Sequence, residues 1–394
     1  MSLERVLHDL YARVPLGMRL GLDAMEEACE VAGNPERAFA SVHVAGTNGK
    51  GSVCAMVESI ARADGRKTGL YTSPHLCRFA ERIRIDGEPI ADDALAALLT
   101  RVLDQAPDLS FFETATLAAF TAFRDAGVDV AMIEVGIGGR LDATNVLEAP
   151  RAAAITRIAL EHTDRLGPTL SDIAREKAGI AKPGLDLVLG PISSDLRAVI
   201  DGVARARGAT TSVAEATLPP ALGLAGDHQR ENATIAAVLG ARIGASDAAI
   251  ARGLVAANWP GRLERIGPYL LDAAHNPDGA LSLAQYVRSL GTPPERTTLI
   301  FGALAEKEWA PMLETLAPLA ATRIYVAPRT SRSAVDPSAI AAVCTGSVAG
   351  DVDVALASAA HGDGQLVVVA GSIFLVGAAR SRLLGLPCDP PVAL

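Results

Sequence analysis

The chain has 394 residues, more than a single hydrophobic core usually organises, so two domains are expected. Hydrophobic residues make up 49% and charged residues 21%, which fits a folded globular protein and argues against extensive disorder. The formal net charge of -9, without clustered Lys and Arg, argues against a protein that binds nucleic acid through its phosphate backbone.

The first part of the chain predicts a strand, a glycine-rich loop and a helix in that order. Residues 1–29 carry apolar side chains at helical spacing and predict two short helices. Residues 39–44 alternate, run apolar into the glycine-rich segment 46–52 and predict a strand, after which residues 53–62 predict a helix. This order is the context that a phosphate-binding loop requires.

Alternation of apolar strands and helices continues beyond this loop. Residues 128–135, 152–156 and 185–189 predict buried strands, and residues 228–243 predict a further helix. Such alternation indicates a parallel sheet covered by helices on both faces. We therefore expect an α/β domain with a P-loop-type parallel sheet over residues 1–258.

A domain boundary is predicted where helix breakers gather, at Asn258-Trp259-Pro260-Gly261-Arg262. The chain then restarts with predicted strands, which alternate with helices and form a second, smaller α/β unit of Rossmann-like character over residues 259–394. These strands cover residues 269–272, 298–302, 323–327 and 365–370.

The glycine-rich loop has the chemistry of a phosphate cradle, although it departs from the strict pattern. Gly51 separates Lys50 from the hydroxyl of Ser52, and Val44 stands where the pattern has glycine. Small residues still let backbone N–H groups approach phosphate oxygens, and Lys50 can reach the terminal phosphates. The alternative is a glycine-rich turn with a solvent-facing lysine. The predicted nucleotide-binding residues here are Gly46, Thr47, Asn48, Gly49, Lys50, Gly51 and Ser52.

Two further segments place polar groups directly after predicted strands. Glu134 closes an apolar strand and precedes several glycines, which puts a carboxylate at the sheet edge where open α/β folds bind ligands. A solvated strand end explains it equally well. In the second domain, Asp272 and His275 follow a strand, while a turn capped by Asn276 accounts for Asn276-Pro277 by itself.

Segment 43–52 closely resembles the nucleotide loop of the folylpolyglutamate synthase and dihydrofolate synthase family, a branch of the Mur ligase superfamily. The resemblance covers nearly the whole chain. Further segments that are similar to family blocks, in the same order, are 71–76, 111–113, 134–145 and 176–180.

The resemblance implies an ATPase domain with a magnesium site. The residues matching Ser73, Glu134 and His162 hold magnesium in the family, and the oxygen ligands of Ser73 and Glu134 suit this ion. His162 is a softer ligand, and a hydrogen-bonded structural histidine remains the alternative. The sequence alone predicts that Lys177 is an ordinary lysine on a helix surface. The resemblance implies instead that Lys177 is carbamylated, which would give an anionic oxygen ligand near a second magnesium; an unmodified lysine paired with an acid remains open. The predicted metal set is Ser52, Ser73, Glu134, His162 and Lys177.

The resemblance also assigns residues that bind ATP from outside the loop. It implies that Asp272 and His275 face the ATP phosphates, that Arg262 binds phosphate, and that Asn232 lies near adenine. A planar guanidinium pairs bidentately with phosphate oxygens, which suits Arg262. The predicted catalytic set is Lys50, Lys177, Asp272 and His275.

The implied activity is that of an ATP-dependent acid–amino-acid ligase. A carboxylate of dihydropteroate or folate attacks the γ-phosphate of ATP, and the amine of L-glutamate displaces the resulting acyl phosphate. The sequence does not decide whether the chain glutamylates dihydropteroate, folates or both. We expect a monomer with ATP and two Mg²⁺ ions, and no nucleic-acid or membrane partner.

Two alternatives stay open at this point. A cell-wall Mur ligase usually carries a substantial UDP-binding domain before its nucleotide loop, and Lys50 comes too early for one. A regulatory protein could bind ATP without chemistry. Within the family pattern, Ala80 replaces the usual Asn and leaves the positioning of substrate or loop in doubt, while Phe79, Phe111 and Phe112 are candidates for stacking on the pterin.

Cysteine usage and the chain start point to the cytoplasm. The five cysteines are odd in number and have no metal-ligand spacing, so reduced, packed thiols are expected. The first residues lack the uninterrupted apolar core of a secretory signal, and no stretch is long and apolar enough to span a bilayer.

Overall fold

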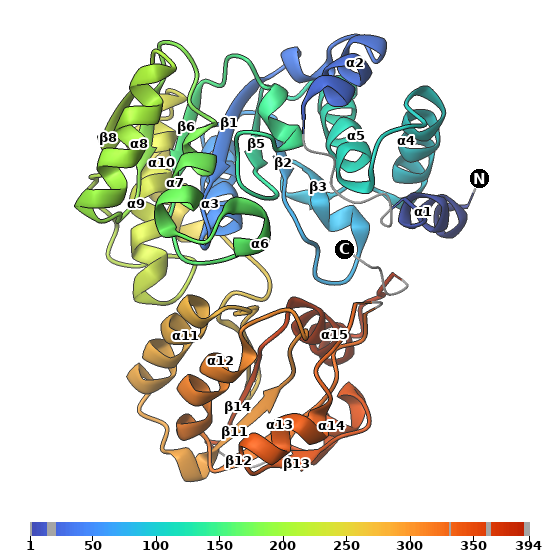
Figure 1. The fold of residues 1–394 in the computed structure, drawn as a ribbon, viewed down its shortest axis with the longest axis vertical. Coiled ribbons are helices and arrows are strands. Elements are labelled where there is room, and N and C mark those ends of the chain that lie inside the picture. Colours follow the sequence, from blue (N-terminus) through green and yellow to red (C-terminus); the bar gives the residue numbers. More distant parts are fainter. Residues whose placement is uncertain (1, 14–20, 331, 360–363, 390–394) are drawn as a thin grey trace. The chain divides into compact units, whose positions relative to one another are not determined.

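The computed structural model divides into two compact units (Figure 1). It describes residues 2–13, 21–330, 332–359 and 364–389. Unit 1 comprises Met1–His75, Phe79–Gly223 and Gln229–Asn258. Unit 2 comprises Trp259–Leu394 with two short segments from earlier in the chain, Leu76–Arg78 and Leu224–His228.

Unit 1 is built on a sheet of eight strands in the order β4-β3-β2-β5-β1-β6-β7-β8. The strands from β2 to β8 in this order are parallel, while β3 and β4 form an antiparallel edge. The strands are β1 (Ala40–Ala45), β2 (Thr68–Tyr71), β3 (Ile83–Ile85), β4 (Glu88–Pro89), β5 (Val130–Glu134), β6 (Ala152–Ile155), β7 (Asp186–Leu189) and β8 (Thr210–Val213).

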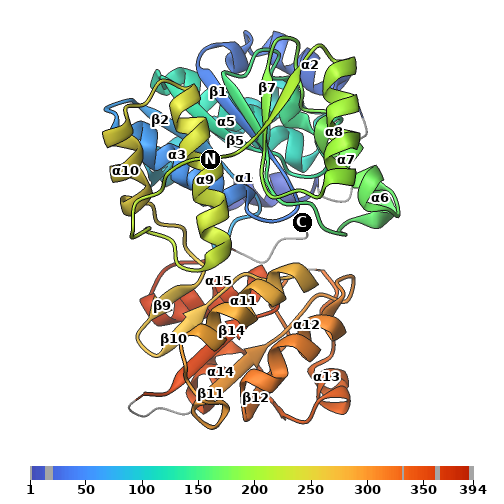
Figure 2. The same cartoon turned by 90° about the vertical axis from the view of Figure 1, so that its left-hand side faces the viewer.

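Helices cover both faces of this sheet, as expected for central strands that are mostly apolar and almost fully buried. Figure 2 shows α7 and α8 on one side of the strands, with α3 and α10 on the other. The helices are α1 (Leu3–Tyr11), α2 (Asp23–Val31), α3 (Lys50–Ala63), α4 (Asp92–Gln105), α5 (Phe111–Ala126), α6 (Thr163–Leu166), α7 (Leu170–Ala178), α8 (Ser194–Ala206), α9 (Asp227–Arg242) and α10 (Asp247–Ala256). Three short 3-10 helices are η2 (Pro35–Arg37), η3 (Phe79–Arg82) and η4 (Ala143–Val146).

Packing between α3 and α10 depends on the absence of a side chain at Gly253. A Cβ atom there would overlap the backbone of Ile60, and Gly240 on α9 also lies against the Ile60 side chain. Ser59 adds a hydrogen bond from its hydroxyl to the Gly253 carbonyl oxygen at 2.8 Å. The close approach anchors α3, the helix that begins at Lys50, against two neighbouring helices.

Unit 2 has a sheet of six strands in the order β13-β12-β11-β14-β10-β9, parallel except for the edge strand β9. Its strands are β9 (Glu264–Ile266), β10 (Tyr269–Leu271), β11 (Thr297–Phe301), β12 (Thr322–Tyr325), β13 (Ser347–Val348) and β14 (Leu366–Ala370). Its helices are α11 (Pro277–Ser289), α12 (Trp309–Leu316), α13 (Pro337–Val343), α14 (Val352–Ser358) and α15 (Ile373–Leu384), with the 3-10 helices η5 (Pro294–Arg296) and η6 (Ala317–Leu319).

Alternating side chains of these strands build two separate cores in unit 2. Leu299 and Phe301 pack toward α11 and α12, whereas Ile300 between them packs toward α14 and α15. A strand places successive side chains on opposite faces, so a fully apolar strand can serve both layers. The unit is therefore a three-layer α/β structure.

The predicted fold class is confirmed in both units. The predicted strands at 39–44, 128–135, 152–156 and 185–189 correspond to β1, β5, β6 and β7, and the four strands predicted after residue 259 correspond to β10, β11, β12 and β14. The sequence did not indicate β2, β3, β4, β8, β9 and β13, all of which have four residues or fewer. Within the described part of the chain, no helix combines the length and apolar character needed to cross a bilayer.

Candidate active site

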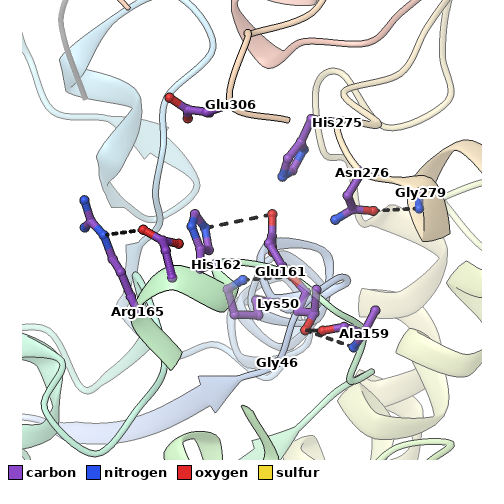
Figure 3. Close-up of polar contacts among 12 residues, drawn as sticks. Gly46, Lys50, Ala159, Glu161, His162, Arg165, His275, Asn276, Gly279 and Glu306 are labelled. Carbon is purple, nitrogen blue, oxygen red and sulfur yellow. Dashed lines mark hydrogen bonds and ion pairs between the residues drawn. The ribbon is translucent and has the colours of Figure 1, made fainter. Parts of the chain in front are cut away.

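The glycine-rich loop joins β1 to the N-terminus of α3, as the sequence predicts. Gly49 is the N-cap residue with φ +91°, and Gly46 has φ +149°, backbone conformations that residues with side chains rarely adopt. No side chain caps α3, so its first N–H groups are available to an anionic ligand, which the helix dipole also favours. The Lys50 ammonium donates to the Thr47 carbonyl oxygen at 3.1 Å (Figure 3).

Contacts from the segment after β6 hold the loop in place from behind. The Thr156 hydroxyl donates to the Asn48 carbonyl oxygen at 2.7 Å, and the Thr47 N–H donates to the Arg157 carbonyl oxygen at 2.7 Å. The Thr47 hydroxyl both donates to and accepts from the backbone of Ala159, each at 3.1 Å (Figure 3). The side chain and the backbone N–H of Thr47 are thus both engaged within the protein, so this residue holds the loop in place.

Asn232 and Ser52 lie at opposite ends of a buried chain of hydrogen bonds that passes through the Gln229 amide. The Asn232 Nδ2 donates to Gln229 Oε1 at 2.9 Å, and Gln229 Nε2 donates to the Ser52 hydroxyl at 3.2 Å. A Cβ at Gly49 would overlap Asn232 Oδ1, so Asn232 borders the loop. The structure therefore brings the predicted adenine-side residue Asn232 next to the predicted phosphate loop.

Glu134 and Ser73 meet at the carboxyl edge of the sheet. Glu134 ends β5 and is buried, and its Oε2 accepts a hydrogen bond from the Ser73 N–H at 3.0 Å. A carboxylate and a hydroxyl from neighbouring strand ends are oxygen donors of the kind that Mg²⁺ prefers. The chemistry of these two residues fits the predicted metal.

His162 has a strained backbone conformation at the start of α6. Its φ is +52°, in the left-handed region that a residue with a side chain seldom occupies. Its Nε2 lies 3.9 Å from Glu161 Oε1 (Figure 3). Strain held at one residue often marks a functional site. Among the described residues, no three His, Cys, Asp or Glu side chains form a ready metal cluster, so an ion here would need other oxygen donors.

Lys177 is buried in the structure, although its sequence context suggested a helix-surface position. Its ammonium donates to the Gly46 carbonyl oxygen at 2.8 Å. Burial and the nearby Lys50 ammonium lower the pKa of Lys177 to about 7, against the opposing effect of Glu161 and Asp142. An amine with this pKa is partly unprotonated at neutral pH and can act as a nucleophile.

A buried carboxylate that the sequence analysis did not single out organises the loop after Glu134. Asp142 accepts hydrogen bonds from the Ile137 N–H at 2.9 Å, the Thr144 N–H at 3.0 Å and the Thr144 hydroxyl at 2.5 Å. The same hydroxyl lies 2.8 Å from Nε2 of His43, which is buried on β1. Burial raises the pKa of Asp142, against these hydrogen bonds, and lowers the pKa of His43 to about 3.

In unit 2, Asp272 holds the backbone of the neighbouring loops. Its Oδ2 accepts from the Leu263 N–H and its Oδ1 from the Ala274 N–H, both at 2.9 Å. Leu263 has φ +48°, so this hydrogen bond supports a strained residue. Asp272 is buried and follows β10 directly. Its geometry favours a positioning role for the loop that carries Arg262.

Arg262 and His275 flank this carboxylate in the chain. Arg262 is half-buried and has no hydrogen bond or ion pair with any residue that the structure describes, which leaves its guanidinium for a ligand. His275 Nδ1 lies 2.9 Å from the Ala273 carbonyl oxygen, which makes Nδ1 the protonated ring nitrogen of the neutral side chain. Asn276 caps α11 by accepting from the Gly279 N–H at 2.8 Å, as a capped turn predicts (Figure 3).

Two domain models of the Mur ligases match the chain. The Mur ligase middle domain matches residues 44–186, and the Mur ligase glutamate ligase domain matches residues 261–373. The folylpolyglutamate synthase of Lacticaseibacillus casei is 36% identical over 398 residues, covering 90% of this chain and 92% of that protein. The chain belongs to the folylpolyglutamate synthase and dihydrofolate synthase family of Mur ligases.

Solved structures of this family agree with the fold over almost its whole length. The Yersinia pestis bifunctional folylpolyglutamate synthase/dihydrofolate synthase complexed with AMPPNP and Mn ion has a TM-score of 0.88 and 30% identity, covering 97% of this chain and 98% of that one. Escherichia coli FolC in complex with DHPP and ADP has a TM-score of 0.87 and 29% identity, covering 96% and 97%. The chain spans about half of a longer relative, the probable bifunctional folylpolyglutamate synthase/dihydropteroate synthase of Halobacterium salinarum, at 46% of its length.

The Mur ligase models cover most candidate site residues. Lys50, Glu134 and Lys177 fall within the middle-domain match, and Arg262 falls within the glutamate ligase match. Asn232 and its partner Gln229 lie between the two. Gln229 escaped the sequence analysis, although a Gln and an Asn three residues apart share one face of a helix.

Most of the aromatic residues near the site lie in the hydrophobic core. Phe79 and Phe111 are buried against each other with ring centroids 6.0 Å apart, and the buried Arg82 guanidinium lies over both rings. Phe112 is partly exposed and packs against Tyr71 at 6.2 Å between ring centroids. Of the three stacking candidates, Phe79 and Phe111 are buried and Phe112 is partly exposed. Ala80 is buried within η3.

Proposed function

We propose that this chain is an ATP-dependent ligase that joins L-glutamate to dihydropteroate, to the glutamate tail of folates, or to both. The observation that carries the proposal is the loop itself, in which glycines with positive φ present the N-terminus of α3 and Lys50 to a phosphate chain. Support comes from relatives named for these reactions, and from the ADP and DHPP bound by the Escherichia coli protein.

The residues of this chain would bring about phosphoryl transfer mainly by placement and charge neutralisation. A substrate carboxylate attacks the γ-phosphorus of ATP and ADP leaves; the amine of glutamate then attacks the carbonyl carbon of the acyl phosphate, loses a proton and expels phosphate. Lys50 would neutralise charge on the phosphate oxygens. Arg262, whose guanidinium lacks a partner among the described residues, would bind phosphate, and Asp272 would hold its loop.

We assign residues 1–258 to ATP binding and residues 259–394 to the glutamate ligase domain. Divalent cations would be held by Ser52, Ser73, Glu134 and His162, and we propose two Mg²⁺ ions. The Mn ion in the Yersinia pestis complex supports a divalent metal. Bound there, the metal supplies Lewis-acid stabilisation of phosphate charge. We further propose that the enzyme works as a monomer in the cytoplasm.

A carbamate on Lys177 is part of the proposal. Its amine is buried, lies against the loop and has a pKa lowered to about 7 by burial and by Lys50, which supplies the unprotonated form that reacts with carbon dioxide. The nitrogen attacks carbon dioxide and loses one proton, and the resulting anion would provide an oxygen ligand for the second magnesium.

The experiment that tests the function measures ADP release with two acceptors side by side. The purified chain is supplied with ATP, Mg²⁺ and L-glutamate, and with either dihydropteroate or tetrahydrofolate. We expect ADP release that requires acceptor and glutamate together, with a glutamylated product seen by mass spectrometry. ATP binding without such release would refute the ligase and favour a regulatory ATP-binding protein.

The carbamate has its own measurement. Wild-type protein equilibrated with ¹³C-bicarbonate should give one carbamate resonance in its ¹³C NMR spectrum, and Lys177→Met should lack it. Lys182→Met serves as the matched control, because Lys182 is also partly buried but donates to the Asn145 carbonyl oxygen away from the loop. A fully active enzyme without the resonance would exclude the modification.

A further inference from the structure

The buried amide chain behind the phosphate loop carries an inference that rests on the proposed function. We propose that Gln229 is a positioning residue that orients the Ser52 hydroxyl toward the divalent cation accompanying the bound nucleotide. Asn232 fixes the direction in which the Gln229 amide points. Neither assignment follows from the phosphate-loop pattern, because Gln229 lies on α9, far along the chain from the loop.

The hydrogen-bond geometry determines which atom of Gln229 faces Ser52. Asn232 Nδ2 can only donate, and it lies 2.9 Å from Gln229 Oε1. The other end of the same amide, Nε2, then points to the Ser52 hydroxyl at 3.2 Å. Gln229 and Ser52 are almost fully buried, at 1% and 3% exposure, so water does not compete freely for these groups.

This contact restricts what the Ser52 hydroxyl can do. A hydroxyl has one proton and two lone pairs, and the Gln229 N–H occupies one lone pair. Ser52 makes no other side-chain hydrogen bond with the residues that the structure describes. The remaining lone pair and the proton are therefore turned away from Gln229 and are left for a ligand. A fixed lone pair is what an oxygen ligand of Mg²⁺ must present.

The position of Ser52 makes the contact relevant to the nucleotide. Ser52 lies in the first turn of α3, two residues after Lys50, and Asn232 borders the same loop at Gly49. The chain Asn232–Gln229–Ser52 thus joins the proposed adenine side of the loop to the proposed metal side. Outer partners that orient metal ligands generally affect metal affinity by about tenfold or more when they are removed.

The test measures how much Mg²⁺ strengthens the binding of ADP to the full chain. Calorimetric titrations with ADP, with and without Mg²⁺, give this enhancement as a ratio of two dissociation constants. Gln229→Met has nearly the same volume but no N–H, and we expect it to lower the enhancement about tenfold. A change in ADP affinity that follows from the lost Asn232 contact is common to both titrations and cancels in the ratio, and a role in packing alone predicts no loss of the enhancement.

Three comparisons make the result decisive. Gln105→Met, at the exposed end of α4, should keep the full enhancement. Ser52→Ala should lose it, and adding Gln229→Met to Ser52→Ala should cause no further loss, because both act through one hydroxyl. If Gln229→Met does not fold, Gln229→Asn replaces it; this variant keeps the amide but shortens its reach, and it should lose the same enhancement.

The outcomes separate this inference from the function on which it rests. A wild-type enhancement that Gln229→Met retains, or a further loss in the double variant, overturns the role of Gln229 and leaves the ligase untouched. A wild-type chain that binds no ADP overturns both. Loss of the enhancement in Gln229→Met and Ser52→Ala, with no further loss in the double variant, establishes the role.

Discussion

Different numbers of side chains hold the phosphate loop of unit 1 and the Arg262–Asn276 segment of unit 2 in place. Several independent contacts hold the loop, from Thr156, Lys177 and the Ala159 backbone. In unit 2 one carboxylate, Asp272, binds backbone N–H groups on both sides of the segment, where Gly261 also pairs with Ala273 and Glu264. Removing Asp272 deprives two N–H groups of their acceptor at once. We therefore expect a larger loss of stability and activity from this change than from removing one contact of the phosphate loop.

The largest expected effect comes from removing a cation that would touch the substrate rather than its support. Lys50→Ala should lower kcat/KM by about a thousandfold, because the variant lacks the charge that stabilises the transferring phosphate. ADP release measures the effect, and circular dichroism should show an unchanged fold. Lys67→Ala is the matched control, since Lys67 is exposed and precedes β2. Near-normal turnover by Lys50→Ala would contradict the assignment of this segment as a phosphate-binding loop.

Asp272→Ala removes the carboxylate that serves two N–H groups of unit 2 at once. Two buried N–H groups, of Leu263 and Ala274, lose their acceptor, which should lower the free energy of unfolding by about 2–4 kcal/mol. The loop that carries Arg262 should also shift, and kcat/KM should fall by about a hundredfold. Urea unfolding and steady-state kinetics measure the two effects. Arg262→Ala should lose similar activity without the loss of stability; equal stability losses in both variants would contradict the assignment.

Thr47→Val tests one of the several supports of unit 1. Valine matches threonine in shape but loses both hydrogen bonds to Ala159, so the free energy of unfolding should fall by about 1–2 kcal/mol. The KM for ATP should rise only about fivefold, because Thr156 and Lys177 still hold the loop. Thr47→Ser, which keeps the hydroxyl, should behave like the wild type. A loss of activity as large as that of Asp272→Ala would break the comparison between the two regions.

The smallest effect on stability at neutral pH is expected for the buried His43, on the strand that leads into the phosphate loop. Its pKa is lowered to about 3 by burial, whereas a histidine in the unfolded chain has a pKa near 6.5. Between these values the unfolded chain binds more protons, so stability falls as pH decreases from about 6.5. His75, also buried, acts in the same direction. His43→Gln should flatten this acid dependence in thermal unfolding between pH 7 and pH 5; an unchanged dependence would contradict it.

Much of the fold could be predicted because it depends on local pattern. Apolar runs of the right length marked the central strands, and glycines before Lys50 marked the loop. The strand β2 escaped because it is short and contains Gly69, where a Cβ would lie 2.8 Å from the Phe123 ring. That glycine is required by packing against α5, a contact between elements distant in the chain. The sequence also did not indicate that the segments Leu76–Arg78 and Leu224–His228 belong to unit 2, because this depends on contacts with residues distant in the chain.

Some candidate site residues could be recognised from their local sequence, and others only from their tertiary contacts. Lys50, Glu134 and Asp272 could be selected from the sequence because each follows a strand or opens a helix at the sheet edge where ligands bind. Gln229 and Asp142 could not, since their importance comes from partners across the fold. Phe79 and Phe111 were candidates for stacking but lie in the core, because their hydrophobic character is equally suited to either place.

The sequence by itself determined eight of the strands, the phosphate loop and the family, because these depend on residues that are neighbours in the chain. Only the tertiary structure decided the burial and the pKa of Lys177, because its helical context alone would place this residue at the surface. Packing of α7 against the loop buries its amine, and burial beside Lys50 lowers its pKa to about 7. Desolvation depends on what surrounds a group in space, which the order of residues along the chain does not specify.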